Sequence, residues 1–271
     1  MSSHDCYLLD LARSRRGPHA IALVHPVSGS AICYAPLAER LWPEATVVGL
    51  QDLGTRAEDV GSLRERAEAY AACLAAHDLG EAGVGGWSFG GLIALELARL
   101  RDGEASPVVL IDPPLVHGSR LPDRPLLRAH LDGLAERTTA LLAATAEDEP
   151  AIRADLAELL AHVALPAQLA ELAPDVLHDY LSLHIAHYRA QFEHTVEAFD
   201  GPVTLVVCDG TLSRHGEAYL AEWRALLSDA DVVVVPGRHE LLFEDPDSIA
   251  AIAATLADTV RPSRLLKGAR A

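Results

Sequence analysis

The residues most able to do chemistry in this sequence are a serine and its glycine neighbours. Gly86-Trp87-Ser88-Phe89-Gly90 fits the pattern G-x-S-x-G, between an apolar segment and an Ala/Leu-rich one. A serine hydroxyl is a weak nucleophile at neutral pH, so it needs a base within hydrogen-bond reach and donors for an oxyanion. The pattern supplies part of this geometry, because it places the serine on a tight strand-to-helix turn. It predicts that Ser88 is a nucleophile; the alternative is a glycine-rich turn with a buried serine.

Two backbone N–H groups are the candidates for holding the oxyanion. The helix that follows Ser88 directs its N-terminus at the reaction centre, which makes the Phe89 N–H the first candidate. The second should come from the loop after the first clear strand, residues 25–30, and we choose the Val27 N–H. The alternative is that this loop is an ordinary connection.

The base and the acid must come later in the chain, because this kind of site uses the order Ser, acid, His. His239 follows a predicted strand and a Pro-Gly turn, and His215 is the next candidate. Asp112 and Asp209 each end a predicted strand, so either carboxylate is able to reach the histidine and fix its tautomer. Spacing alone leaves the choice between the two acids open.

The elements that must position these residues are short apolar strands that alternate with helical segments. This alternation predicts a mostly parallel sheet with helices on both faces. Between about 115 and 199 the pattern changes to Leu, Ala and charged residues at helical spacing. We therefore expect one α/β domain over 1–271, with an α/β-hydrolase fold and a helical lid insertion at about 115–199. The predicted strands are 20–24, 46–50, 82–86, 107–111, 203–208 and 232–235.

Several polar side chains of the predicted lid follow helical spacing. His184, His187, Gln191 and His194 fall on one helix face, without a carboxylate at a spacing that would favour a metal site. We expect a polar lid face there, beside a packing stripe. Arg120, Arg124 and Arg128 are four residues apart, and they either attract a phosphate or are solvated.

Composition excludes several classes of protein. The formal net charge is -17, which disfavours binding to nucleic acid or to an anionic membrane. Apolar runs are too short to span a bilayer. The four cysteines are far apart, so we predict neither a zinc site nor a disulfide framework. A reduced, cytoplasmic protein without a metal is the expectation.

These segments resemble the thioesterase domains that end nonribosomal peptide synthetases and polyketide synthases. The resemblance rests on the run from Gly86 to Gly91 followed by Ala94-Leu95-Glu96-Leu97-Ala98, on Pro26-Val27-Ser28-Gly29, on Leu110-Ile111-Asp112 and on Pro236-Gly237-Arg238-His239. It covers about 20–256. It implies that Asp112 is the acid, as in the type I members, whereas type II editing thioesterases place it near Asp209.

The resemblance also implies a function. We expect a thioesterase that takes an acyl or peptidyl chain from the phosphopantetheine of a carrier protein, in polyketide or nonribosomal peptide biosynthesis, and needs no cofactor of its own. Release to water and cyclisation would use the same residues. Alternatives are an acyltransferase with an external acceptor, a type II editing enzyme, an ordinary carboxylesterase and a catalytically silent binding protein.

Overall fold

A seven-stranded sheet runs through the part of the chain that the computed structural model describes, which is residues 7–11, 19–101, 107–114, 124–163 and 165–260. The strand order is β1-β3-β2-β4-β5-β6-β7, with β1 antiparallel to β3 and every other pair parallel. The strands are β1 Tyr7–Asp10, β2 Ala20–Val24, β3 Thr46–Gln51, β4 Gly83–Trp87, β5 Val108–Ile111, β6 Val203–Cys208 and β7 Ala230–Val235. The predicted mostly parallel sheet is confirmed.

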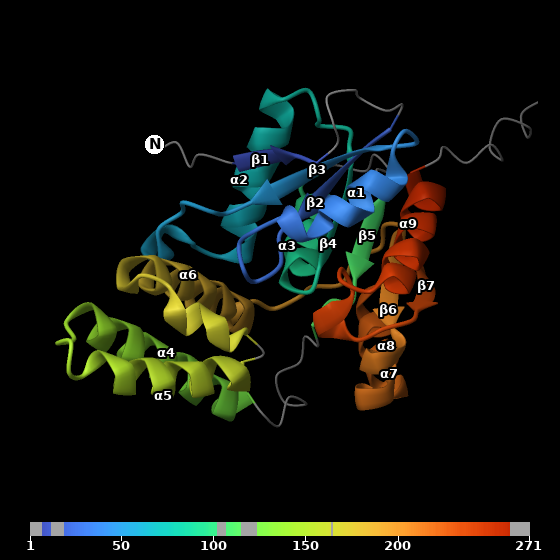
Figure 1. Ribbon diagram of the computed structural model, residues 1–271. Helices are drawn as coiled ribbons and strands as arrows, with labels where there is room; N and C mark the ends of the chain where they lie inside the picture. The colour runs from blue at the N-terminus through green and yellow to red at the C-terminus, as the bar shows by residue number, and fades with distance from the viewer. Residues whose placement is uncertain (1–6, 12–18, 102–106, 115–123, 164, 261–271) are drawn as a thin grey trace, which may run out of the picture.

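Helices cover both faces of this sheet (Figure 1). Successive side chains of β2 point to opposite faces: Ala22 and Val24 join one buried cluster, whereas Ile21 and Leu23 join another. Helices α2, α3 and α8 pack in the first cluster and α1 and α9 in the second. The α-helices of this part are α1 Ala35–Leu41, α2 Leu63–Ala76, α3 Phe89–Arg99, α7 Asp209–His215, α8 Glu217–Leu226 and α9 Pro246–Val260.

Between β5 and β6 the described residues form helices, with only an isolated bridge at Phe199. We call α4 Arg124–Leu142, α5 Glu149–His162 and α6 Pro174–Glu193 the lid helices. They enclose a separate apolar cluster that includes Leu181 and Ile185, which confirms the predicted packing stripe. Figure 1 shows them as a group beside the sheet. Residues 115–123 lie outside the described residues, so the exact start of the insertion stays a prediction.

The structure corrects the sequence-based description in three places. The N-terminal segment forms the edge strand β1, and α7 follows β6 directly; neither was predicted. Cys73 is disulfide-bonded, which the sequence did not predict, whereas Cys33 and Cys208 are free. In the described part of the chain, no helix combines the length and apolarity that crossing a membrane requires.

Short 3-10 helices complete the described structure at several loops. They are η1 Ile32–Tyr34, η2 Ala57–Asp59, η4 Ala167–Glu171 and η5 His239–Leu241. The first precedes α1 and the last carries the predicted base.

Candidate active site

Ser88 occupies a strained turn between β4 and α3. Its backbone has φ 54° and ψ -124°, a region that residues with a side chain rarely adopt. The turn is close-packed: a Cβ on Gly86 would lie 2.3 Å from the Gly90 carbonyl carbon, and one on Gly90 would lie 2.2 Å from the Val24 oxygen. Only glycine fits at either position, which explains the G-x-S-x-G spacing.

A chain of hydrogen bonds joins Ser88 to two residues far along the sequence. His239 Nε2 lies 3.1 Å from Ser88 Oγ, and His239 Nδ1 lies 2.7 Å from Asp112 Oδ2. The side chain of His239 is 32% exposed and therefore accessible to solvent, whereas Asp112 is buried. With its proton on Nδ1, the ring donates to Asp112 and presents a lone pair to the serine hydroxyl. This arrangement is able to remove the hydroxyl proton.

Asp112 is held by donors on three sides. Besides His239, the backbone N–H of Cys208 donates to Oδ1 at 3.1 Å and the Thr211 hydroxyl donates to Oδ2 at 2.7 Å. Burial alone would raise the pKa of Asp112, but the hydrogen bonds and the charge of His239 hold it below its ordinary value. A carboxylate at this position would stabilise a positive charge on the His239 ring.

The alternative acid and base lie elsewhere. Asp209 begins α7, and its Oδ1 accepts from the Gly237 N–H at 3.0 Å. This hydrogen bond links the start of α7 to the turn that precedes His239. His215 ends α7, with its ring stacked against Tyr219. The geometry favours Asp112 and His239, whose catalytic roles stay predictions.

Tyr34 supports the turn that carries Ser88. Its hydroxyl donates to the Val24 carbonyl at 2.7 Å and accepts from the Trp87 N–H at 2.9 Å. Its ring is buried, and burial raises the pKa of Tyr34 well above its ordinary value, so the hydroxyl keeps its proton. One side chain thus links β2 to the residue before Ser88.

Of the two predicted oxyanion donors, one follows Ser88 directly in sequence and the other lies in the loop after β2, the strand that pairs with β4. Phe89 opens α3 directly after Ser88, and the first N–H groups of a helix have no partner within it. Val27 lies in the loop after β2, where the Gly29 N–H donates to the Pro26 carbonyl at 2.9 Å and closes a turn. Their roles as donors also stay predictions.

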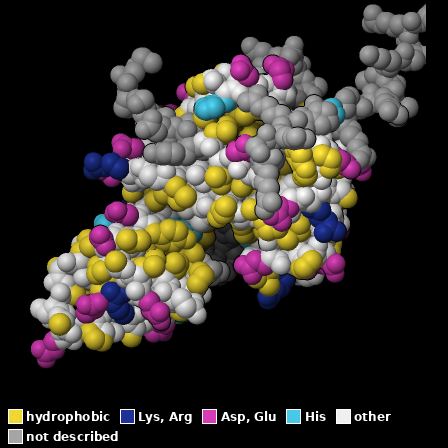
Figure 2. All heavy atoms as spheres, turned by 45° about the horizontal axis from the view of Figure 1, so that its top comes forward, with side chains coloured by type: hydrophobic (Ala, Val, Ile, Leu, Met, Phe, Trp, Pro, Cys, Tyr) yellow, Lys and Arg dark blue, Asp and Glu magenta, His cyan; other side chains and the backbone are white. Residues whose placement is uncertain are grey.

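The polar residues of the lid helices do not form the polar face that their spacing predicted. His184 and His187 are buried, and His194 lies near Glu96, with its Nε2 3.6 Å from a carboxylate oxygen. Of the three arginines, the Arg128 guanidinium lies over the Phe192 ring. Arg120 and the side chain of Arg124 lie outside the described residues. Figure 2 shows hydrophobic side chains over the lid helices, beside a hollow between them and the sheet.

Sequence reasoning missed several supporting residues. Thr211 makes a hydrogen bond that no motif predicts, and the two hydrogen bonds of Tyr34 were not predicted either. Asp52 was also missed, although it directly follows β3, at the same carboxyl edge of the sheet as Asp112. A polar residue at the end of each parallel strand is the signal that would have found it.

A scan against family descriptions matches the thioesterase domain over residues 19–260. None of the curated proteins is similar enough to count as a relative. Among solved structures, the thioesterase domain from the nocardicin cluster, NocB, is 25% identical, with 94% of this chain and 97% of that one covered and a TM-score of 0.63. The same domain is also solved in covalent complex with a fluorophosphonate nocardicin G analogue.

Two further structures share the fold. The four-domain nonribosomal peptide synthetase AB3403 matches at 24% identity and a TM-score of 0.68, over 93% of this chain but 20% of that one. RedJ, a thioesterase from the prodiginine pathway in Streptomyces coelicolor, matches at 19% identity, a TM-score of 0.62 and 90% and 91% coverage. These likenesses confirm the α/β-hydrolase architecture of the chain.

Proposed function

The chain belongs to the thioesterase domain family, and from this premise we propose that it releases an acyl or peptidyl chain from a carrier-protein thioester through an ester on Ser88. The observation that carries the proposal is the unbroken hydrogen-bonded path from Asp112 through His239 to Ser88. Such a path is the requirement for activating a serine hydroxyl at neutral pH.

In the first half of the proposed reaction, Ser88 Oγ attacks the thioester carbonyl while His239 Nε2 takes the hydroxyl proton. Asp112 stabilises the resulting imidazolium, and the Val27 and Phe89 N–H groups bind the oxyanion. When the tetrahedral intermediate collapses, the carbon–sulfur bond breaks and His239 returns the proton to the departing thiolate. The products are an acyl ester on Ser88 and the free thiol of the carrier's phosphopantetheine.

In the second half, another nucleophile attacks the Ser88 ester and gives its proton to His239. Water yields a free acid, whereas a hydroxyl or amine of the acyl chain itself yields a ring. An external acceptor in the same place would make the protein an acyltransferase. His239 then returns the proton to Ser88 Oγ, so the free enzyme is regenerated without a cofactor.

The proposed partner is an acyl or peptidyl carrier protein of polyketide or nonribosomal peptide biosynthesis. Support comes from the family and from the structural likeness to a domain within a multidomain synthetase. The covalent fluorophosphonate complex of the similar NocB domain supports the use of the same reagent class here.

The test is intact-protein mass spectrometry with a fluorophosphonate and with N-acetylcysteamine thioesters of varied acyl chains. We expect one adduct per protein on the peptide that contains Ser88, with none on Ser88→Ala. The released product identifies water, ring closure or transfer. Labelling that is equal in Ser88→Ala would refute the proposal.

A further inference from the structure

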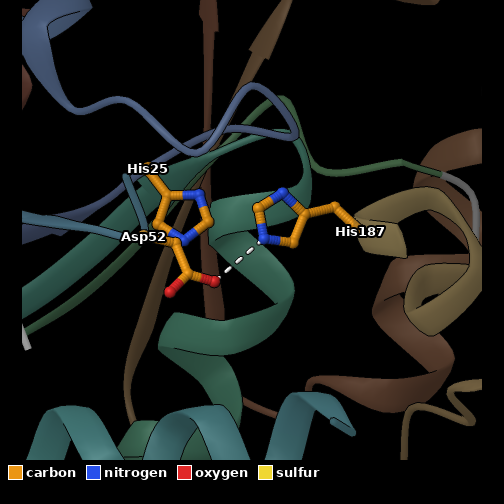
Figure 3. Close-up of side chains that lie close together, drawn as sticks. All are labelled: His25, Asp52 and His187. Carbon is orange, nitrogen blue, oxygen red and sulfur yellow. Dashed lines mark hydrogen bonds and ion pairs between the residues drawn. The ribbon is translucent and has the colours of Figure 1, made fainter. Parts of the chain in front are cut away.

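Two histidines and an aspartate form a buried cluster beneath the loop that carries Val27. His25 comes from the loop after β2, Asp52 from the end of β3, and His187 from the lid helix α6 (Figure 3). Each is at most 1% exposed. The proposed reaction does not involve any of these side chains directly, so their burial calls for another role.

The two histidine rings hold the carbonyl groups on either side of Val27. His25 Nδ1 lies 2.7 Å from the Pro26 oxygen, and His187 Nδ1 lies 2.9 Å from the Val27 oxygen. A carbonyl oxygen only accepts, so both Nδ1 atoms are donors. The Pro26 carbonyl belongs to the same peptide unit as the Val27 N–H. A hydrogen bond to that carbonyl fixes the plane of the peptide and polarises its N–H as a donor.

The second nitrogen of His187 is anchored to an ion pair. Its Nε2 lies 3.0 Å from Asp52 Oδ2, while Arg66 lies 2.9 Å from Asp52 Oδ1. Burial would raise the pKa of Asp52, but the hydrogen bond from His187 and the charge of Arg66 lower it to about 2. Asp52 is therefore a carboxylate, and both ring nitrogens of His187 face acceptor oxygens.

Helix α6 reaches this loop because Gly29 has no side chain. A Cβ at Gly29 would lie 3.1 Å from a methyl group of Leu183 and 3.3 Å from the His187 ring, both on α6. The backbone of Gly29 has φ +80°, which also favours glycine. In addition, the Asp52 N–H donates to the Gly29 carbonyl at 2.8 Å. The loop is thus held by α6 and by the end of β3 together.

We infer that His25 and His187 are positioning residues that fix the Val27 peptide in the orientation required to bind the oxyanion, and that His187 ties the lid helix α6 to that donor. The inference rests on the proposed function, because it assigns an oxyanion to this loop. Its consequence is that a displacement of α6 alters the rate of acyl transfer without any contact between His187 and substrate.

A bound cation is the competing explanation of the same cluster. The possible ligand atoms of the three side chains lie within 4.8 Å of one another, and His25 Nε2 is buried without a hydrogen-bond partner in the described part of the chain. However, Arg66 already neutralises Asp52, and the short contact between His187 and Asp52 is explained by a hydrogen bond. The observations favour the hydrogen-bonded arrangement without a metal, and the test includes a measurement of the metal content of the protein.

Two substitutions at His187 separate its two hydrogen bonds. His187→Asn places an amide N–H near the position of Nδ1, so it still donates to the Val27 carbonyl but does not reach Asp52. His187→Gln reaches Asp52 but leaves the Val27 carbonyl without its donor. His184→Asn is the matched control, because His184 is equally buried on the same helix but packs against Tyr180 and Tyr188.

The measurement is the single-turnover rate of Ser88 acylation by an N-acetylcysteamine thioester, with steady-state KM and thermal melting alongside. Misplacing a catalytic group by about 1 Å costs roughly 100-fold in rate. We expect His187→Gln to lower acylation and kcat about 100-fold at unchanged KM. His187→Asn and His184→Asn should stay within about fivefold of the wild type, even where they melt earlier.

Three outcomes count against the inference. Equal losses in His187→Asn and His187→Gln would mean that the Val27 hydrogen bond is unimportant. A rate that merely follows thermal stability across all three variants would indicate a structural role alone. One equivalent of a divalent metal in the wild type, absent from both His187 variants, would favour a metal centre. If the wild type itself forms no Ser88 ester, the proposed function fails instead.

Discussion

Asp112→Asn should disable the site by reversing the tautomer of His239. The Asp112 oxygens accept from the Cys208 N–H, the Thr211 hydroxyl and His239. An asparagine has one acceptor oxygen, and placing its NH₂ group against the Cys208 N–H would oppose two donors. The amide therefore turns its oxygen toward Cys208 and its NH₂ group toward His239. The ring must then accept at Nδ1 and carry its proton on Nε2, facing Ser88.

The expected loss of activity follows from the position of the His239 proton. A ring with N–H at Nε2 cannot take the Ser88 proton, although every atom of the site remains in place. The corresponding tautomer change in a well-studied serine protease costs about 10⁴ in kcat. We therefore expect Asp112→Asn to lose about 10³ to 10⁴, equivalent to roughly 4 to 5.5 kcal/mol in the barrier.

Asp209→Asn is the matched control. Its carboxylate accepts from the Gly237 N–H, and an asparagine oxygen is able to accept in the same way. We expect less than about a threefold loss. Thiol release from an N-acetylcysteamine thioester gives kcat, and thermal melting shows whether each variant is folded. A folded, active Asp112→Asn together with an inactive Asp209→Asn would show that Asp209 is the acid and that this reasoning is wrong.

Three further changes test the packing around the site. Gly90→Ala should prevent folding or cost more than about 3 kcal/mol, because its Cβ would meet the Val24 oxygen at 2.2 Å; expression and urea unfolding measure this. Tyr34→Phe leaves the partly buried Trp87 N–H without its acceptor and should lower the free energy of unfolding by about 1 to 3 kcal/mol, which urea unfolding also measures. Burial lowers the pKa of His184 from 6.5 to about 3, so below pH 6.5 the unfolded chain binds a proton that the folded protein excludes until about pH 3. As the pH is lowered across that range, the free energy of unfolding should fall by about 1.4 kcal/mol per pH unit. His184→Asn should remove this contribution to the pH dependence.

The sequence predicted the parts of the site that depend on local rules. The G-x-S-x-G spacing follows from contacts within one turn, where Gly86 and Gly90 leave no room for a Cβ. The parallel strands are apolar because both faces are covered, so their positions could be identified. Asp112 and His239 became candidates because each follows such a strand, but the choice of Asp112 over Asp209 depended on the family resemblance.

The features that the sequence did not predict depend on contacts between distant segments of the chain. Strand β1 is short and pairs only with β3, so its residues lack the apolar run of the buried strands. His187 and Asp52 are 135 residues apart and meet only when α6 packs over the loop after β2. Helical spacing placed His187 on a lid face with His184, but periodicity does not show which element that face meets.

Substitutions on the two faces of helix α6 should therefore have different effects on stability and on activity. Leu181 and Ile185 pack with the other lid helices, so substitutions there should lower the free energy of unfolding. Leu183 and His187 lie against the loop after β2 at Gly29, so substitutions there should change kcat if the proposed role of this loop is right. A cavity-forming Leu181→Ala that lowers kcat as strongly as His187→Gln would contradict this division. Thermal melting and the KM-to-kcat comparison of the two variants decide between a lid that only shapes substrate binding and one that also positions a catalytic donor.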